Sequence, residues 1–256
     1  MNSTERCRCY RRRILEISQQ VTAVHVAPAF SCVEIVDALY NEIMRPQDIF
    51  IMSKGHGCLA QYVILEELGL LSREDMDLYC KPGGRLGAHP DYAPELGIHA
   101  STGSLGHGLG IATGQAMAEK IKGSDVTVYC LLSDGELQEG SSWEAMMMAA
   151  NLGLTNLVAL VDNNDFGGLD RMSDRHPAFY PLVDKAIAFG WEAVEADGHD
   201  SLSLATGIPM LRSEQPLFVA CRTVKGKGVS YMEHNPIFHY RSPTQEEYNQ
   251  ALAEID

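Results

Sequence analysis

The stretch Val126-Thr-Val-Tyr-Cys-Leu-Leu132 is a continuous apolar run that leads directly into Ser133-Asp-Gly-Glu136. A second run, Leu157-Val-Ala-Leu-Val161, leads in the same way into Asp162-Asn-Asn-Asp-Phe166. Continuous apolar runs are typical of strands that are buried on both faces of a sheet. These two segments therefore predict two core strands, each followed by a polar turn.

The segment between the two runs predicts a helix. Residues 142–151 are rich in Ala and Met, Gly153 ends the segment, and Ser141-x-x-Glu144 is a candidate capping box at its start. We expect Met146 to Met148 to lie in the core. Strand, helix and strand in this order indicate a parallel sheet with a crossover helix.

The rest of the chain extends this α/β pattern. Further strands are predicted at 48–52, around 191–194 and at 217–221, and helices at about 5–21, 32–44, 58–68 and 108–122. We expect a three-layer α/β fold with a mostly parallel central sheet flanked by helices. No linker or repeat divides the chain, so residues 1–256 are predicted to form a single domain, with a basic N-terminal helical arm over about 1–20.

Composition excludes several classes of protein. The 256 residues are 45% hydrophobic and 21% charged, which is typical of a folded soluble protein. A net charge of −14 disfavours binding to nucleic acid, although a metal ion or a helix N-terminus can still attract a small phosphorylated ligand. No apolar run approaches the roughly 18 residues of a membrane span. Seven scattered cysteines indicate reduced thiols in a cytoplasmic protein, and Cys7 and Cys9 lack a second pair at zinc-site spacing.

Ligands of parallel sheets bind at the carboxyl ends of the strands, where Asp134 and Asn164 are expected. The two residues belong to one strand-helix-strand unit, so their side chains should meet at one edge of the sheet. A carboxylate and an amide oxygen suit Mg²⁺. Asp-Gly and Asn-Asn are also common turn dipeptides, so a purely structural role stays open. Asp162 and Asp165 fit a turn or a supporting role better than metal binding.

These residues resemble a known motif. Ser133-Asp-Gly135 followed by the Asn163-Asn164 doublet is similar to the thiamine-diphosphate motif of transketolases. The resemblance implies that Asp134, the Asn164 side chain and the Phe166 carbonyl hold Mg²⁺ and the diphosphate, and that Gly135 lets the backbone approach the phosphate. Ser133 stands where the family has glycine, and a negative φ would accommodate it.

A glycine-rich segment extends the resemblance. Thr102-Gly-Ser-Leu-Gly-His-Gly-Leu-Gly110 is similar to a transketolase loop, which implies cofactor contacts from Gly103 and from the Leu105 backbone. Glu139 matches a family glutamate at the subunit interface. Glycines 108, 110 and 114 alone would suggest a dinucleotide site, but the preceding residues 94–101 do not resemble a strand, which disfavours that interpretation.

Four histidines occupy positions where transketolases contact the sugar and the cofactor. His56 lies in Ser-Lys-Gly-His-Gly, and a histidine at a helix N-terminus tends to stay neutral. The resemblance implies catalytic roles for His25, His56, His89 and His239, and a cofactor contact for His56. Each histidine alone could equally be structural. The segment 221–229, Cys-Arg-Thr-Val-Lys-Gly-Lys-Gly-Val, also resembles the family, as either a ligand contact or a basic turn.

The resemblance implies a transketolase that uses thiamine diphosphate and Mg²⁺ to move a two-carbon ketol unit from a ketose to an aldehyde. Full transketolases add a pyrimidine-binding domain with an essential glutamate, which does not follow Asp256 here. We therefore expect a split enzyme with a pyrimidine-binding partner subunit in an α₂β₂ assembly, acting on a sugar or sugar phosphate. The alternatives are a noncatalytic binding subunit, an enzyme with a 2-oxo acid donor and, less favoured, a nicotinamide oxidoreductase.

Overall fold

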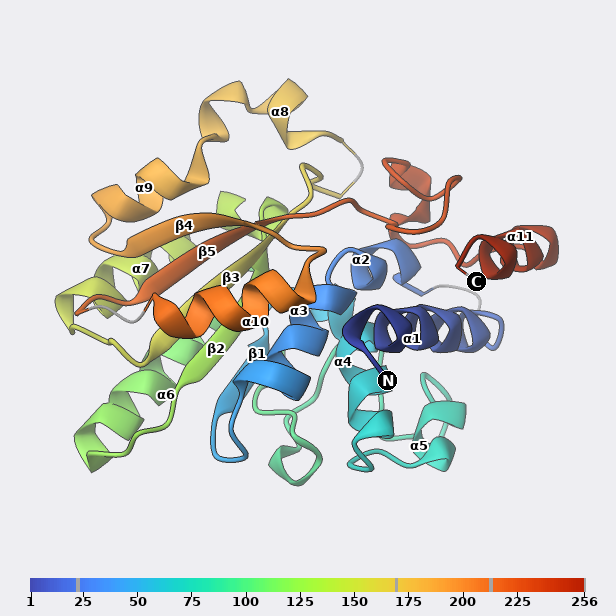
Figure 1. Cartoon of the computed structure of the whole chain (residues 1–256), viewed down its shortest axis with the longest axis horizontal. Helices are drawn as coiled ribbons and strands as arrows, with labels where there is room; N and C mark the ends of the chain where they lie inside the picture. The colour runs from blue at the N-terminus through green and yellow to red at the C-terminus, as the bar shows by residue number, and fades with distance from the viewer. Residues whose placement is uncertain (22–23, 169, 212–213, 256) are drawn as a thin grey trace.

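The computed structural model describes residues 1–21, 24–168, 170–211 and 214–255. Five strands form one sheet in the order β1-β2-β3-β5-β4, and every pair of neighbours is parallel (Figure 1). This arrangement confirms the predicted α/β class and each predicted strand. The strands are β1 (Ile49–Met52), β2 (Val128–Ser133), β3 (Leu157–Asn163), β4 (Glu192–Asp197) and β5 (Leu217–Arg222).

Helices cover both faces of the sheet, with α10 and α3 on the side facing the viewer in Figure 1. None of the helices in the described ranges is long and apolar enough to cross a membrane. The α-helices are α1 (Ser3–Ser18), α2 (Val26–Phe30), α3 (Val33–Ala38), α4 (Cys58–Glu67), α5 (Arg73–Asp77), α6 (Gly108–Lys122), α7 (Gly140–Asn151), α8 (Met172–Arg175), α9 (Leu182–Ala188), α10 (Ser201–Met210) and α11 (Gln245–Ile255). Shorter turns are the π-helix η1 (Leu39–Ile43) and the 3₁₀ segments η2 (Gly55–Gly57), η3 (Pro94–Leu96), η4 (Gly135–Gln138), η5 (Pro177–Phe179) and η6 (Pro236–His239).

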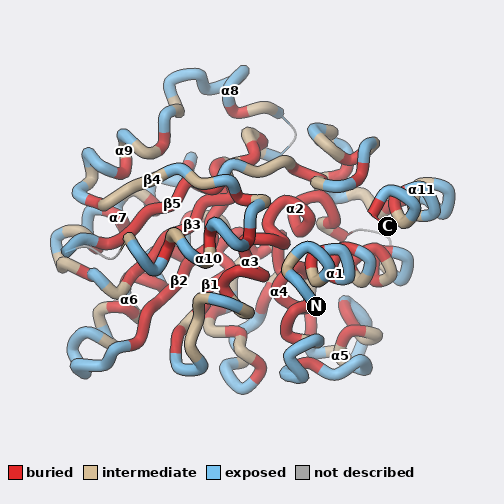
Figure 2. The backbone as a smooth tube through the Cα atoms, viewed as in Figure 1, coloured by how far each residue is buried: buried red, intermediate tan, exposed pale blue. Residues whose placement is uncertain are grey.

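The core has two halves because successive side chains of a strand point to opposite faces. In β2, Tyr129 and Leu131 pack with α1, α3, α4 and α10, whereas Cys130 and Leu132 pack with α6, α7 and α9. Both faces of the central strands are therefore buried, as Figure 2 shows along β2, β3 and β5. This explains why the sequence of these strands is apolar without alternation.

The start of α7 differs from the prediction. The capping box at Ser141 does not form, because Glu139 is the N-cap residue and the Ser141 hydroxyl donates to the Gly106 carbonyl at 2.9 Å. The expectation that Met146 to Met148 are all core is also wrong. Met146 is buried, but Met147 and Met148 lie on the outer side of the helix and are about half exposed.

The predicted basic arm corresponds to α1, whose apolar face is buried against α3 and α4. Its arginines do not form the exposed basic face that the sequence suggested. Arg6 binds Asp37, and Arg13 binds Glu66. Arg11 is buried, where it makes two hydrogen bonds to Glu34 of α3. Acidic partners on neighbouring elements thus neutralise much of the helix's charge.

One buried ion pair lies at the carboxyl end of the sheet. Lys54, directly after β1, contacts Asp162 of β3, and both side chains are inaccessible to solvent. Burial alone would lower the pKa of Lys54, but the Asp162 carboxylate more than offsets this effect and the net pKa is raised. Asp162 also accepts hydrogen bonds from Ser31 and Thr223. The pair therefore joins segments that follow three different strands or helices.

We predict that Lys54→Met strongly destabilises the fold, because it leaves the buried Asp162 carboxylate without a counter-charge. Loss of one partner of a buried pair costs about 3–5 kcal/mol. Urea denaturation of the full chain would measure the change in the free energy of unfolding. The control Arg85→Ala removes an exposed pair with Asp75 and should cost less than about 1 kcal/mol. Equal effects of the two substitutions would contradict the prediction.

Candidate functional site

A cavity of about 310 Å³ opens at the carboxyl ends of the strands. Its walls come from the segments that follow β1, β2, β3 and β5, together with the 103–105 loop, His25, His89 and η6. All the site residues predicted from the sequence line this cavity except Asp134, which is buried behind the wall. Those that line it are His25, His56, His89, Gly103, Leu105, Gly135, Glu139, Asn164, Phe166 and His239.

Asp134 joins the turns that follow β2 and β3. One carboxylate oxygen accepts from the Gly135 backbone at 2.8 Å, and the other accepts from the Asp165 backbone at 2.6 Å and from the Tyr180 hydroxyl at 3.1 Å. Burial, and then the nearby Asp162 carboxylate, raise the pKa of Asp134 to about 7. No cation among the described residues pairs with this carboxylate, so a bound metal ion would relieve its burial.

Oxygen atoms of the neighbouring turn lie close to Gly135. A Cβ atom at Gly135 would lie 3.2 Å from the Phe166 carbonyl oxygen and 3.0 Å from the Gly167 Cα, so a side chain there would crowd the turn. The Asn164 side-chain oxygen accepts from the Phe166 backbone at 3.1 Å. Ser133 ends β2 without a positive φ, so the conformational condition set for this departure from the family motif is met. Carboxylate, amide and carbonyl oxygens together suit Mg²⁺.

The opposite wall is a tightly packed loop. Gly103 has φ 133°, and a Cβ there would lie 2.9 Å from the His89 ring, so only glycine fits without a shift. Glu136, buried beneath the loop, accepts hydrogen bonds from the Gly106 backbone at 3.0 Å and from the Ser53 hydroxyl. These contacts fix the backbone on either side of Leu105.

The four histidines predicted from the sequence form one cluster. The His25 ring lies 5.9 Å from His56, 5.6 Å from His89 and 5.4 Å from His239, measured between ring centroids. His25 Nδ1 is buried without a hydrogen-bond partner. An orphaned polar atom beside a polar cavity is what a site for a hydroxylated ligand requires.

The histidines of this cluster are neutral at pH 7. Burial, and then neighbouring positive groups, lower the pKa of His25 to about 4 and that of His239 to about 3. Burial and then Lys54 lower the pKa of His56 well below its usual value. His56 is thus neutral as predicted, mainly because it is buried rather than because it lies near a helix N-terminus. Neutral imidazoles can both donate and accept hydrogen bonds.

Two lysines of the cavity wall were not identified as site residues from the sequence. Lys54 is paired with Asp162, and Lys225 donates a hydrogen bond to the His239 Nδ1 atom at 2.8 Å. Both lie in glycine-containing turns directly after buried strands, which is the signal that could have assigned them to the site. Other residues of the wall outside the prediction are Pro28, Ser133, Gln138, Gly167 and Gly168.

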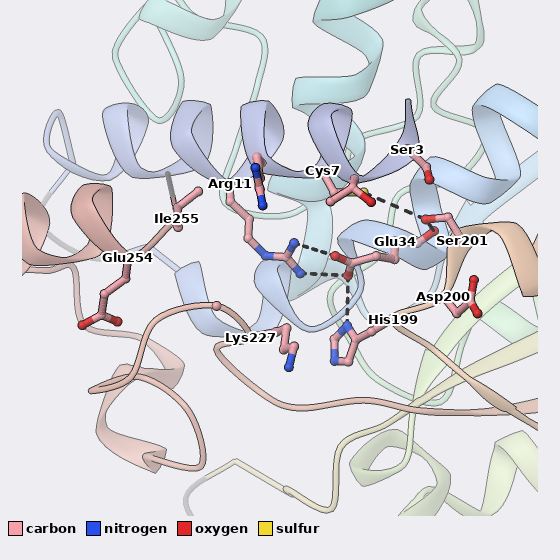
Figure 3. A pocket seen from close by; sticks show the side chains of 13 residues that line it. Ser3, Cys7, Arg11, Glu34, His199, Asp200, Ser201, Lys227, Glu254 and Ile255 are labelled. Atoms are coloured by element: carbon pink, nitrogen blue, oxygen red, sulfur yellow. Dashed lines mark hydrogen bonds and ion pairs between the residues drawn. The ribbon is translucent and has the colours of Figure 1, made fainter. Parts of the chain in front are cut away.

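A second cavity, of about 520 Å³, shares no lining residue with the first. Figure 3 shows Arg11 and His199 directed at Glu34 inside it. His199 Nδ1 lies 3.0 Å from Glu34, and its other ring nitrogen accepts from the Val224 backbone at 2.8 Å. Because these groups already satisfy one another, we interpret the network as a structural tie between α1, α3 and the segment after β4.

The chain matches known proteins over most of its length. Residues 11–251 match the family model described as "Transketolase, thiamine diphosphate binding domain". One of the two subunits of an apulose-4-phosphate transketolase from Phocaeicola vulgatus is 36% identical over 96% of this chain and 90% of its own length. A 6-deoxy-6-sulfo-D-fructose transketolase subunit from Clostridium sp. is 33% identical over 96% of this chain and 93% of its own.

Solved structures show the same fold. The transketolase from Campylobacter jejuni superposes with a TM-score of 0.87 at 25% identity, and that from Leishmania mexicana with 0.89 at 24% identity. The chain is covered completely in both cases but spans only 43% and 41% of those proteins. From the match over residues 11–251 and the similarity to subunits of nearly its own length, the chain belongs to the family of transketolase thiamine-diphosphate-binding domains.

Proposed function

We propose that the chain is the diphosphate-binding subunit of a two-subunit, thiamine-diphosphate-dependent transketolase. Such an enzyme transfers a two-carbon ketol unit from a ketose to an aldehyde. The observation that carries this proposal is the convergence of four histidines with the oxygen-rich turns of Asp134 and Asn164 on one cavity wall. The relatives named as transketolase subunits have nearly the length of this chain, which supports the same division of labour.

The oxygen-rich turns would hold the charged end of the cofactor. Asp134, the Asn164 side chain and the Phe166 carbonyl would bind Mg²⁺ and, through it, the diphosphate. Gly135 leaves room for phosphate oxygens, and the backbone at Gly103 and Leu105 would face the aminopyrimidine. The uncompensated Asp134 carboxylate and the crowding that a Cβ at position 135 would cause support this assignment.

Thiamine diphosphate, when bound, supplies the nucleophilic carbon that cleaves and forms carbon–carbon bonds. The chain's own residues contribute orientation and hydrogen bonds. The neutral rings of His25, His56, His89 and His239 would contact the hydroxyl groups of the ketose, where each can donate or accept. Their partial burial excludes water from this side of the cavity.

A partner subunit completes the proposal. It would be a pyrimidine-binding, transketolase C-terminal-type subunit that brings the activating glutamate, and the two chains would form an α₂β₂ heterotetramer. Glu139, exposed at the cavity rim, would lie at this interface. The names of the relatives support a sugar phosphate as substrate and disfavour a 2-oxo acid donor. The seven free cysteines support a reducing compartment, the cytoplasm.

The first prediction concerns the partner. Native mass spectrometry of the tagged chain purified from its own cells, with Mg²⁺ and thiamine diphosphate supplied, should detect a heteromer that carries the cofactor. The sequence of the second chain should contain a pyrimidine-binding domain. The isolated chain should not transfer ketol units, because half of the cofactor's contacts are missing. Full activity of the isolated chain would overturn the two-subunit proposal.

The second prediction concerns the metal. In the assembled complex, Asp134→Asn should weaken the binding of thiamine diphosphate in the presence of Mg²⁺ by more than about 100-fold, since even residues behind metal ligands change affinity by 10–100-fold. Isothermal titration calorimetry would measure the dissociation constant, with and without a chelator. Asp170→Asn, an exposed aspartate of the same loop, should leave it unchanged. Undiminished affinity of Asp134→Asn would contradict the metal assignment.

The third prediction separates sugar contacts from cofactor contacts. His89→Asn in the complex should lower kcat/KM for the ketose by at least about tenfold, because a hydrogen bond to the substrate is lost. The dissociation constant of thiamine diphosphate should change less than about threefold, within the scatter expected when no cofactor contact is removed. His176→Asn, on an exposed histidine outside the cavity, is the control. A loss confined to cofactor binding would remove His89 from the sugar site.

A further inference from the structure

Lys225 lies where two walls of the cavity meet. It follows β5, and only 2% of its surface is exposed. Its Nζ atom is 2.8 Å from Nδ1 of His239 and 3.3 Å from the Gly168 carbonyl oxygen. The same atom lies 5.3 Å from the centre of the Phe166 ring. One ammonium group therefore ties the turn after β3 to η6, which carries His239.

The chemistry of this contact fixes where His239 carries its proton. A lysine ammonium has three donors and no acceptor, so Nδ1 of His239 must be the acceptor. A neutral imidazole whose Nδ1 atom accepts has its single proton on Nε2. A second proton on the ring would oppose the ammonium of Lys225, with Lys54 adding a further positive charge nearby. The geometry thus selects one tautomer.

The other ring nitrogen remains available to a ligand. His239 lines the cavity, and no hydrogen bond to its Nε2 atom occurs among the described residues. With the proton on Nε2, this position is a donor only. It can contact a hydroxyl, carboxyl or phosphate oxygen, but it cannot accept a proton in a hydrogen bond from the substrate.

We propose that Lys225 is a positioning residue that holds His239 as the Nε2–H tautomer and so makes it an oxygen-directed donor in the cavity. Lys225 itself need not touch the substrate. The inference rests on the proposed function only in naming that substrate as a sugar, because the tautomer is a property of this chain alone. Tautomer and activity can therefore fail independently.

The test is a long-range ¹H–¹⁵N correlation spectrum of the full chain labelled with [¹⁵N]histidine, recorded at pH 7. The His239 signals are assigned by their absence in His239→Gln. The wild-type protein should show His239 as the Nε2–H tautomer. Lys225→Met keeps the length of the side chain but removes the donors, so its His239 signals should move to an average of both tautomers. Lys225→Arg retains donors and should keep the wild-type pattern.

The matched control is Lys227→Met, in the same turn but outside this cavity, where the side chain lies 4.0 Å from Glu233. It should leave the His239 signals unchanged. An Nδ1–H or averaged spectrum in the wild-type protein would overturn the proposal, as would an unchanged Nε2–H spectrum in Lys225→Met. If melting curves show that Lys225→Met does not fold, the wild-type and Lys225→Arg spectra decide, because both must show the Nε2–H form.

Kinetics of the assembled complex provide a second readout. Lys225→Met should lower kcat/KM for the ketose by roughly tenfold, the effect of misdirecting one hydrogen bond, whereas Lys225→Arg should recover most of it. A complex that shows the predicted tautomer but transfers no ketol unit would contradict the proposed function and leave the role of Lys225 intact. A tautomer change without any kinetic effect would show that His239 does not donate to the substrate.

Discussion

The buried pairing of Lys54 with Asp162 is the constraint on which the cavity depends. Neither side chain reaches solvent, so each charge needs the other to remain ionised inside the protein. Lys54 also donates to the Pro28 carbonyl at 2.9 Å, and Asp162 accepts from Ser31 and Thr223. The turn after β1, the helix α2, the strand β3 and the turn after β5 are thereby joined at one point beneath the cavity.

The parallel sheet explains why the site lies above this point. Its strands all end at the same edge, so the turns after them deliver side chains into one space. Different turns supply different chemistry. Those after β2 and β3 bring the oxygen atoms around Asp134, whereas those after β1 and β5 bring His56 and Lys225. An oxygen-rich end for a metal and diphosphate thus faces a wall of neutral imidazoles suited to a polyhydroxylated substrate.

Local sequence patterns failed where neighbours from elsewhere in the chain decided the outcome. The hydroxyl of Ser141 has a carbonyl partner at Gly106, so it does not cap its own helix. Arg11 lies in a basic segment but is buried, because Glu34 provides a matching charge there. Met147 and Met148 belong to a helix that is only half covered. In each case the residue type is compatible with two environments, and only the packing distinguishes them.

The sequence by itself determined the strands, the glycine turns that follow them and the resemblance that assembled the site residues. Apolar runs and glycines act over short distances, so their effect can be recognised locally. The tertiary structure alone decided that Lys54 meets Asp162, 108 positions away, and that Lys225 meets His239. It also decided which histidines are neutral, since their pKa values depend on burial and on charges brought close by folding. Partners and burial are properties of the packed chain, because they arise between segments that the sequence keeps far apart.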